Sequence, residues 1–326
     1  MPLEIAVASG KGGVGKSTVS STIAIALSRA GRDVIAVDAD ADAPNLHLVL
    51  GVDRWDREIP HSGARVARVV DDLCTGCGAC AQVCPYDAVR VLGDGRYWIS
   101  PVLCEGCATC GLACPVKGAI VREEVTEGRI RVARTRYGFQ LVSAALDPGR
   151  PNTGKLVTEE KDLARRMAGE DSVIVLDSAA GIGCQVVSSL AGSHIAVLVT
   201  EPTPAGFANM RRAHTLTKHF MMPAAVVINK FDLNPGVTSE IESYARENGM
   251  EVLGRIPYDD SVPRSMVMMM PHIEAFPDSE AAKALMGIGN RVVEIARDWK
   301  GWWFEHRPRK IEPYKPVIIS PRRVKR

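Results

Sequence analysis

Cysteine is the residue type whose spacing says most about the chemistry of this chain. Eight of its nine cysteines form two runs of the pattern C-x2-C-x2-C-x3-C-P, which start 30 residues apart (104 − 74). In such runs three thiolates hold one iron–sulfur cubane, and the fourth usually ligates the cubane of the other run. The predicted ligands are Cys74, Cys77, Cys80 and Cys114 for cluster A, and Cys104, Cys107, Cys110 and Cys84 for cluster B. The sequence therefore predicts two [4Fe–4S] clusters in an internally duplicated unit.

Zinc sites and disulfide frameworks also use closely spaced cysteines. Zinc takes four ligands in two pairs, whereas each run here supplies three evenly spaced cysteines and a fourth before a proline, Pro85 or Pro115. The first residues lack the basic segment of a secretory signal, and reduced thiols are typical of the cytosol. We therefore expect clusters rather than zinc or disulfides, in a cytoplasmic protein.

A second motif points to phosphate chemistry. An apolar run at 3–8 is followed by a glycine-rich loop and then by an alanine-rich stretch that reaches residue 30. The loop reads Gly10-Lys11-Gly12-Gly13-Val14-Gly15-Lys16-Ser17-Thr18. In this strand–loop–helix context, backbone N–H groups converge on phosphate oxygens, Lys16 reaches the β and γ phosphates, and Ser17 binds Mg²⁺. The motif predicts a nucleotide-binding site.

Lys11 refines the class of the loop, which resembles the deviant Walker A motif of the MinD, ParA, Mrp and nitrogenase iron-protein ATPases. In that family this lysine reaches the nucleotide of the partner subunit, so the resemblance implies an ATP-dependent homodimer. The segment from Asp38 resembles the family's switch I, in which Asp40 matches the carboxylate that activates water and Asp38 supports Mg²⁺. The predicted catalytic residues are Lys11, Lys16 and Asp40.

Residues 173–183 form an apolar run that ends in Asp177 and a glycine-containing turn, as Walker B and switch II segments do. We expect Asp177 to face Mg²⁺ through water. Cys184 follows at once, and a lone cysteine is usually a small buried apolar residue. Iron proteins and Mrp-type carriers use two cysteines per protomer for a bridging cluster, so a single one argues against such a cluster here.

The base-binding segment supports two interpretations. Asn229-Lys230-Phe231-Asp232 matches the N-K-x-D motif with which GTPases recognise guanine. MinD-type ATPases carry a similar Asn-Lys pair and bind adenine through the asparagine and backbone groups after an Ile-Pro, here Ile256-Pro257. The deviant loop favours ATP, with Asn229, Lys230 and Pro257 as nucleotide contacts.

The elements that must position these residues alternate between strands and helices. Apolar runs predict strands at 34–37, 195–200 and 224–229, and helical stretches are expected at 205–219, 238–248 and 278–297. The predicted fold is α/β, with a doubly wound, mostly parallel sheet of the MinD type and an inserted small α+β unit that resembles bacterial two-cluster ferredoxins. The expected domains are the core (1–58 and 137–299), the inserted domain (60–136) and a basic, proline-rich tail (300–326).

The tail carries nine Lys or Arg against two Glu, and its prolines start at Pro308, so we expect no helix there. It is predicted to be structural or to bind a protein, with Trp299, Trp302 and Trp303 as anchors. No nucleic-acid-binding module is recognisable. With 46% hydrophobic and 24% charged residues, the chain is typical of globular proteins, and we expect no membrane span.

Three functions follow from these motifs. The first is an ATP-hydrolysing dimer that couples its nucleotide state to electron transfer with a redox or metalloprotein partner. The second is a carrier that assembles or delivers iron–sulfur clusters. The third is a MinD-like regulatory switch in which the clusters are structural. The expected cofactors are ATP, Mg²⁺ and two [4Fe–4S] clusters.

Overall fold

A single large sheet organises the protein. The computed structural model describes residues 1–147 and 153–308. Its nine-stranded sheet has the order β11-β10-β9-β1-β8-β2-β7-β6-β3. The strands are β1 (Leu3–Ser9), β2 (Val34–Ala39), β3 (Arg57–Val69), β6 (Ile120–Arg134), β7 (Gln140–Leu146), β8 (Val173–Ala180), β9 (Ile195–Thr200), β10 (Ala224–Asn229) and β11 (Glu251–Ile256). The run from β11 to β7 is parallel, and β6 and β3 are antiparallel additions, which confirms the predicted mostly parallel sheet.

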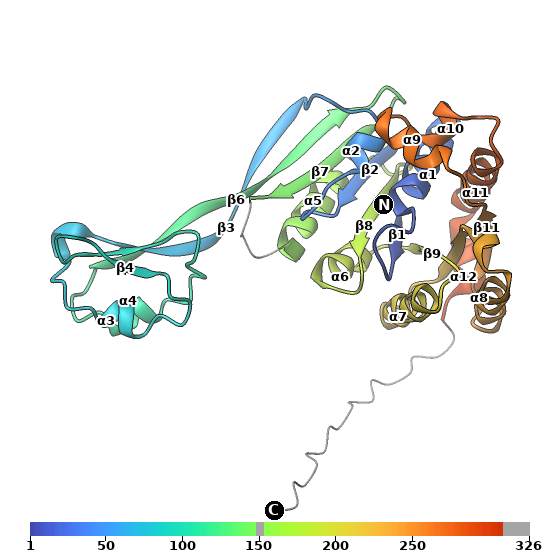
Figure 1. Cartoon of the computed structure of the whole chain (residues 1–326). Coiled ribbons are helices and arrows are strands. Elements are labelled where there is room, and N and C mark those ends of the chain that lie inside the picture. Colours follow the sequence, from blue (N-terminus) through green and yellow to red (C-terminus); the bar gives the residue numbers. More distant parts are fainter. Residues whose placement is uncertain (148–152, 309–326) are drawn as a thin grey trace, which may run out of the picture.

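Helices cover both faces of the sheet (Figure 1). They are α1 (Lys16–Arg29), α2 (Leu46–Val49), α5 (Thr153–Met167), α6 (Cys184–Leu190), α7 (Pro204–His219), α8 (Pro235–Glu247), α9 (Ser261–Val267), α10 (His272–Ala275), α11 (Glu280–Arg297) and α12 (Trp299–His306), with a short 3₁₀ turn η2 (Phe231–Leu233). Because both faces are covered, the central strands are apolar throughout, and every residue of β1, β2 and β9 is buried. None of the described helices is both long and apolar enough to cross a membrane.

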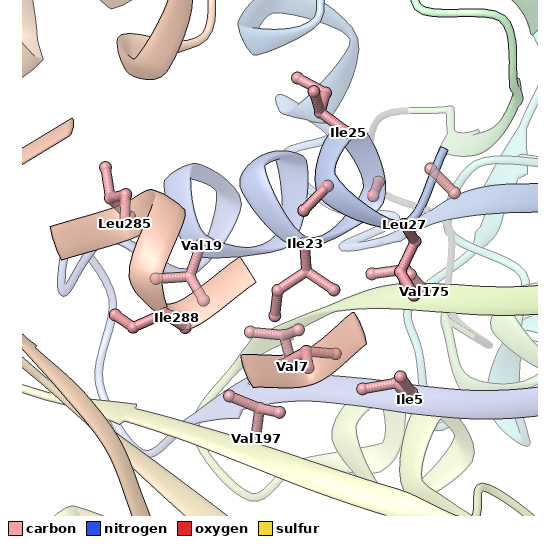
Figure 2. Close-up of a cluster of buried hydrophobic side chains, with 14 of the residues drawn as sticks. Ile5, Val7, Val19, Ile23, Ile25, Leu27, Val175, Val197, Leu285 and Ile288 are labelled. Atoms are coloured by element: carbon pink, nitrogen blue, oxygen red, sulfur yellow. The ribbon is translucent and has the colours of Figure 1, made fainter. Parts of the chain in front are cut away.

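Two apolar clusters form the core, one on each side of the sheet. Figure 2 shows the first, where Ile23 of α1 and Ile288 of α11 lie above Ile5 and Val7 of β1. The two helices approach so closely that a Cβ on Gly289 would stand 2.8 Å from the Cβ of Ala26. This packing holds α1, and with it the start of the glycine-rich loop, in a fixed place over β1.

The long strands β3 and β6 leave the main sheet as an antiparallel ladder (Figure 1). Near the core sheet they pair beside β7, and at their far end they carry the cysteine-rich residues. That end contains the 3₁₀ turn η1 (Asp71–Leu73), α3 (Ala79–Gln82), β4 (Val89–Val91), β5 (Tyr97–Ile99) and α4 (Thr109–Ala113). The segment predicted as an insertion, 60–136, thus starts within β3 and ends just after β6. We call the β3–β6 ladder the stalk.

The C-terminal helix α12 contradicts the predicted helix-free tail, because it occupies 299–306 and ends before Pro308, the first residue that would break it. Trp302 is only 6% exposed and its Nε1–H donates to Glu251 Oε2 at 2.7 Å. Trp299 is partly buried against the same core. The tryptophans predicted as anchors for a partner therefore include two that pack on this chain itself. Pro313, Pro316 and Pro321 lie outside the described residues.

Candidate functional site

The glycine-rich loop joins β1 to the N-terminus of α1. Gly13 and Gly15 have positive φ angles of 75° and 94°, which only glycine adopts without strain. A Cβ on Gly10 would stand 2.3 Å from the backbone oxygen of Asn209, so the loop also needs glycine for close approach. The positive end of the α1 dipole and the loop N–H groups together favour an anion at this point.

A cavity of about 370 Å³ opens beside this loop. It is lined by Gly13, Gly15, Lys16, Ser17, Thr18, Asn45, Asn229, Lys230, Pro257, Tyr258, Asp259, Val262, Pro263 and Met266. Eight of the residues predicted to bind nucleotide are in this lining. The other predicted loop residues, Gly10, Lys11, Gly12 and Val14, are not part of it. Its size suits a small-molecule ligand.

Asp38 and Asp177 lie side by side, because β2 and β8 pair in register at these two positions. Both carboxylates are buried. Burial, and next the charge of Asp177, raises the pKa of Asp38 well above its usual value. Burial also raises the pKa of Asp177, against the opposing effects of Lys16 and of hydrogen bonds from two serines of α1. A bound Mg²⁺ would offset this cost, so the pair fits the predicted metal role.

Ser17, the third predicted Mg²⁺ ligand, is at the start of α1, and its Oγ donates to Asn45 Oδ1 at 2.8 Å. Asn45 precedes α2, whose first N–H, that of Leu46, donates to Asp38 Oδ2 at 2.8 Å. The loop after β2 is therefore hydrogen-bonded to both Ser17 and Asp38, two of the predicted Mg²⁺ ligands. Asn45 was not among the predicted site residues, although it lies within the segment from Asp38 to Leu46 that resembles switch I.

Asp40 lies at the carboxyl end of β2, and burial raises its pKa, with the hydrogen bond from the Ala43 N–H and the charge of Lys16 lowering it. Next to it, Gln185 of α6 accepts a hydrogen bond from the Ala41 N–H at 3.1 Å and donates to Asp42 Oδ2 at 2.6 Å. Gln185 thus ties switch I to the helix that follows switch II. The sequence contained no motif that would have identified it.

Lys11 is held within its own chain. Its Nζ donates to Glu201 Oε1 at 2.7 Å, and the Lys230 ammonium lies 3.6 Å from the other oxygen of Glu201. Burial by itself would raise the pKa of Glu201, but Lys11 and then Lys230 lower it below its usual value. Glu201 directly follows β9 and was missed by the sequence reasoning. Lys11, which was predicted to reach the nucleotide of a partner subunit, is thus held in an intramolecular ion pair in this structure.

The contacts of the base-binding segment bear on whether the site binds adenine or guanine. Asn229 Nδ2 donates to the Val14 carbonyl at 2.8 Å and so braces the phosphate loop. Asp232, the carboxylate that would recognise guanine, accepts a hydrogen bond from the Tyr258 N–H at 2.8 Å. Asp232 does not line the cavity, whereas Pro257 and Tyr258 do. The cavity lining therefore matches the residues predicted for adenine, Asn229, Lys230 and Pro257, and does not include the carboxylate predicted for guanine.

The cysteines gather at the far end of the stalk. One cavity of about 20 Å³ is lined by Cys74, Cys77, Cys80 and Cys114, together with Tyr97 and neighbouring apolar residues. Three cysteines of the first run and the fourth cysteine of the second therefore meet, which is the set predicted for cluster A. Cys84, Cys104 and Cys110 belong to the small apolar cluster of this unit, and Cys107 is exposed.

The two runs share one backbone path. Gly76 and Gly106 have φ angles of 69° and 66°, and Gly78 and Ala108 have φ angles of 74° and 66°. A non-glycine residue at positive φ, as at Ala108, is uncommon and is kept where the surroundings require it. The sequence duplication is therefore also a duplication of the loop conformation that presents the thiols.

Hydrogen bonds reach the sulfur atoms in this unit. The Ala67 N–H donates to Cys104 Sγ at 3.3 Å, and the Ala88 N–H donates to Cys84 Sγ at 3.4 Å. Burial raises the pKa of the Cys80 and Cys110 thiols, whereas a hydrogen bond with Thr109 lowers the pKa of Cys107. Such contacts are the ones that adjust the reduction potentials of iron–sulfur clusters.

The arrangement also bears on zinc. Within the two described ranges, no three His, Cys, Asp or Glu side chains converge as they would around a single metal ion. A zinc ion gathers its ligands about one centre, whereas the thiolates of a cubane bind different iron atoms and stand farther apart. The described cysteines therefore do not form the kind of single-ion site that zinc would occupy.

Cys184 corrects one prediction. It was expected to be a buried apolar residue, but it is exposed at the first position of α6, directly after the switch II turn. Ile182, within that turn, is 51% exposed as well.

A phosphate-binding loop at the carboxyl end of the central parallel strand β1, with a buried carboxylate on each of the next two strands, β8 and β2, defines a P-loop nucleotide-binding protein. The model of the CobQ/CobB/MinD/ParA nucleotide binding domain matches residues 5–271, and the chain belongs to this family.

Comparisons with known proteins agree with this assignment. An uncharacterized protein of Methanocaldococcus jannaschii is 33% identical over 236 residues, which span 71% of this chain and 79% of that protein. An iron–sulfur cluster carrier protein of Pyrococcus abyssi is 25% identical over 91% of this chain and 88% of its own length. The crystal structure of the cell division ATPase MinD of Pyrococcus furiosus matches 90% of this chain and 100% of that chain, with a TM-score of 0.57 and 19% identity. The fold is therefore that of MinD.

Proposed function

We propose that this chain is an ATP-hydrolysing dimeric switch that carries two [4Fe–4S] clusters and couples its nucleotide state to electron transfer with a partner protein. In this proposal residues 1–58 and 137–299 form the ATPase core, and 60–136 form an inserted ferredoxin-like domain. The observation that carries it is the sheet order, since β7 joins β2, which contains Asp38 and ends just before Asp40, to the stalk that holds the cysteines.

The residues of the nucleotide site have distinct roles in the proposal. Lys16 and the loop N–H groups bind the phosphates, and Ser17, Asp38 and Asp177 hold Mg²⁺. Asp40 orients the attacking water toward the γ-phosphate. Lys11 leaves Glu201 to reach the nucleotide of the partner protomer, so ATP acts as a ligand that closes the dimer.

The cysteine-rich residues have the ligand role. Cys74, Cys77, Cys80 and Cys114 would hold one cluster, and Cys104, Cys107, Cys110 and Cys84 the other. Such clusters supply one-electron chemistry whose potential depends on hydrogen bonds to sulfur and on solvent exposure. The Ala67 and Ala88 N–H groups provide such bonds; Ala67 lies in the stalk strand β3, and Ala88 directly precedes β4. A small movement of the stalk strand β3 can therefore alter the surroundings of Cys104.

The test is anaerobic potentiometry monitored by electron paramagnetic resonance on the full chain, together with an iron count. Spectra are compared without nucleotide, with ADP and with Mg-ATP. We expect eight irons per chain, as two four-iron clusters require, and a nucleotide-dependent shift in potential or line shape. Unchanged spectra in all three states would refute coupling between nucleotide and clusters.

A second candidate is an iron–sulfur cluster carrier, which is favoured by the similarity to the Pyrococcus abyssi carrier protein. Incubation of the cluster-loaded protein with an apo-acceptor separates the two. Retention of both clusters supports electron transfer, whereas rapid loss of one cluster to the acceptor supports the carrier. Two observations favour retention, namely the burial of Cys80 and Cys110 and their place in the apolar core of the unit.

A further inference from the structure

Helix α5 lies where three functional parts of the molecule meet. It packs against β2 and β7 of the core sheet and against α6, the helix after switch II. Three consecutive residues of α5, Glu159, Glu160 and Lys161, face three different neighbours.

Glu159 contacts the base of the stalk. Its Oε2 lies 2.6 Å from Nδ1 of His61 on β3, and since a carboxylate only accepts, the imidazole donates. His61 is 1% exposed, and its Nε2 lies 3.9 Å from Glu127 of β6. The registers of β3 and β6 shift on both sides of Ser62, so the ladder is bulged at this place. Bulges bend and twist a ladder, and the Glu159–His61 contact therefore acts at a hinge.

Glu160 faces the opposite way, into the sheet. It is completely buried, and its pKa is raised well above the usual value by burial and then by the charge of Asp38. The Ala144 backbone opposes this rise only weakly, and neither carboxyl oxygen of Glu160 has a hydrogen-bond partner within the described residues. Helix α5, which carries this side chain, packs against β2, the strand of Asp38, and against β7, which lies between β2 and the stalk.

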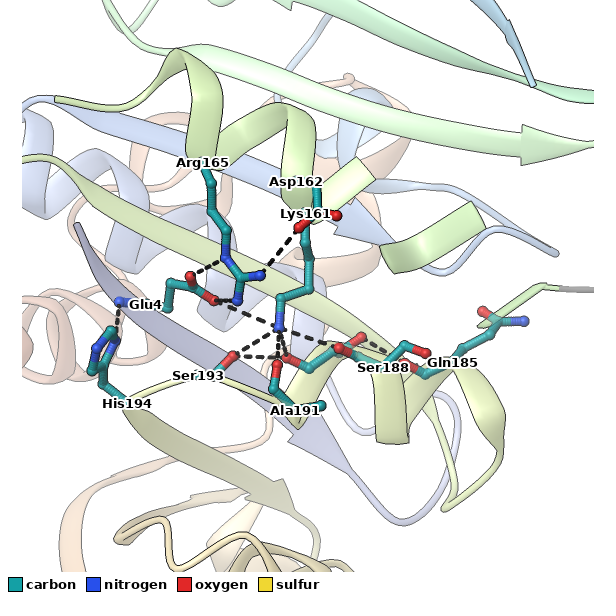
Figure 3. A network of polar contacts seen from close by, with 10 residues as sticks. Glu4, Lys161, Asp162, Arg165, Gln185, Ser188, Ala191, Ser193 and His194 are labelled. Carbon is teal, nitrogen blue, oxygen red and sulfur yellow. Dashed lines mark hydrogen bonds and ion pairs between the residues drawn. The ribbon is translucent and has the colours of Figure 1, made fainter. Parts of the chain in front are cut away.

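Lys161 holds the C-terminal end of α6 (Figure 3). Its ammonium donates to the carbonyls of Ser188, Ser189 and Ala191 at 3.2, 2.7 and 2.7 Å, and it lies 3.5 Å from Glu4 of β1. Cations at a helix C-terminus satisfy its free carbonyls and interact well with the dipole. Since α6 begins at the switch II turn, a displacement of that turn is passed to α5 through this anchored end.

We propose that α5 transmits the nucleotide state to the stalk, and that the Glu159–His61 contact is the positioning pair through which it moves the hinge. This inference rests on the proposed coupling of nucleotide to the cysteine-rich unit. In this path, a change at switch I or switch II reaches α5, and α5 passes it to β3 of the stalk. Glu159 and His61 touch neither nucleotide nor thiol, so they act only through the elements that they join.

The test uses the cluster-loaded full chain and the variant Glu159→Ala. The Glu159 side chain is 40% exposed, so its truncation opens no cavity in the core, and iron content and ATP turnover are measured to show that the fold is kept. Lys155→Ala is the first control, because it removes the Lys155–Glu159 pair at 3.8 Å and keeps the contact with His61. Asp162→Ala is the second, since this carboxylate of α5 is 47% exposed and pairs with Arg165 of the same helix. Amide hydrogen exchange of residues 57–69 and the cluster potentials are measured with and without Mg-ATP.

We expect Mg-ATP to change exchange at 57–69 and the potentials in the wild type and in both controls. In Glu159→Ala both changes should fall to less than half, while ATP turnover and iron content stay at the wild-type level. Equal responses in Glu159→Ala and wild type would overturn the role of α5 and leave the proposed function standing. A wild type in which neither quantity responds to Mg-ATP would overturn both.

Discussion

Release of Lys11 from Glu201 should be a measurable part of dimer formation. The two side chains form a 2.7 Å ion pair in which Lys11 is 48% exposed and Glu201 11% exposed. Because one partner is half exposed, the pair is worth about 0.5–1 kcal/mol. A dimer must break two of them, so the cost of closure is about 1–2 kcal/mol. The variant Glu201→Gln removes the charge and keeps the shape, and should tighten the ATP-dependent dimer about 5- to 30-fold.

The assay is sedimentation equilibrium in Mg-ATP, in an Asp40→Ala background that prevents turnover. Lys11→Ala in the same background is the control, because it lacks the lysine that the dimer requires and should stay monomeric. High salt should reduce the difference in dimer dissociation constant between Glu201→Gln and its parent, because salt screens the partly exposed Lys11–Glu201 ion pair. A Glu201→Gln dimer that is weaker than the parent, or equal to it, would refute the view that Glu201 restrains Lys11.

Three other predictions address the site and the stability of the fold. Lys16→Ala should abolish nucleotide binding, which calorimetry measures. Asp40→Ala should bind ATP normally but stop hydrolysis, which phosphate release measures. Normal turnover in Asp40→Ala would show that another group orients the water. Lys161 has its pKa lowered from 10.5 to about 8, chiefly by burial. Between pH 8 and 10.5 the unfolded chain therefore binds more protons than the folded one, so this residue makes the free energy of unfolding rise with pH. In urea titrations, the free energy of unfolding of the wild type minus that of Lys161→Met should be larger at pH 10 than at pH 7. An equal difference at the two pH values would contradict the lowered pKa of Lys161. Trp302→Phe removes the hydrogen bond to Glu251 and should lower the free energy of unfolding in urea by about 1–2 kcal/mol. An unchanged urea midpoint would show that this hydrogen bond does not stabilise the fold.

The local elements of the nucleotide site were predictable because their signals are local. Strands 195–200 and 224–229 begin and end where the apolar runs predicted, since a strand covered on both faces must be apolar at every position. The glycines of the phosphate loop follow from the backbone angles that the turn requires. Asp38 and Asp177 were predicted separately, each at the end of a strand, and register then placed them together.

For the C-terminal tail, the prediction made from composition was wrong. Its prolines argued against helix, yet the first of them, Pro308, comes after α12 has already ended. The tryptophans were expected to face a partner, but an apolar side chain gives the same signal whether it packs on its own chain or on another. Only the position of Glu251, 51 residues away, decided that Trp302 turns inward.

The sequence by itself determined the chemistry available to this protein, namely a phosphate-binding loop, strand-end carboxylates and two cysteine runs of fixed spacing. Tertiary structure alone decided which of these groups are connected. Lys11 and Glu201 are 190 residues apart, Gln185 and Asp42 are 143 apart, and His61 and Glu159 are 98 apart. Periodicity and spacing report which residues are buried and which conformations the backbone needs, but they carry no information on the partner across such a separation. The chain of contacts from nucleotide site to stalk exists only in the folded sheet.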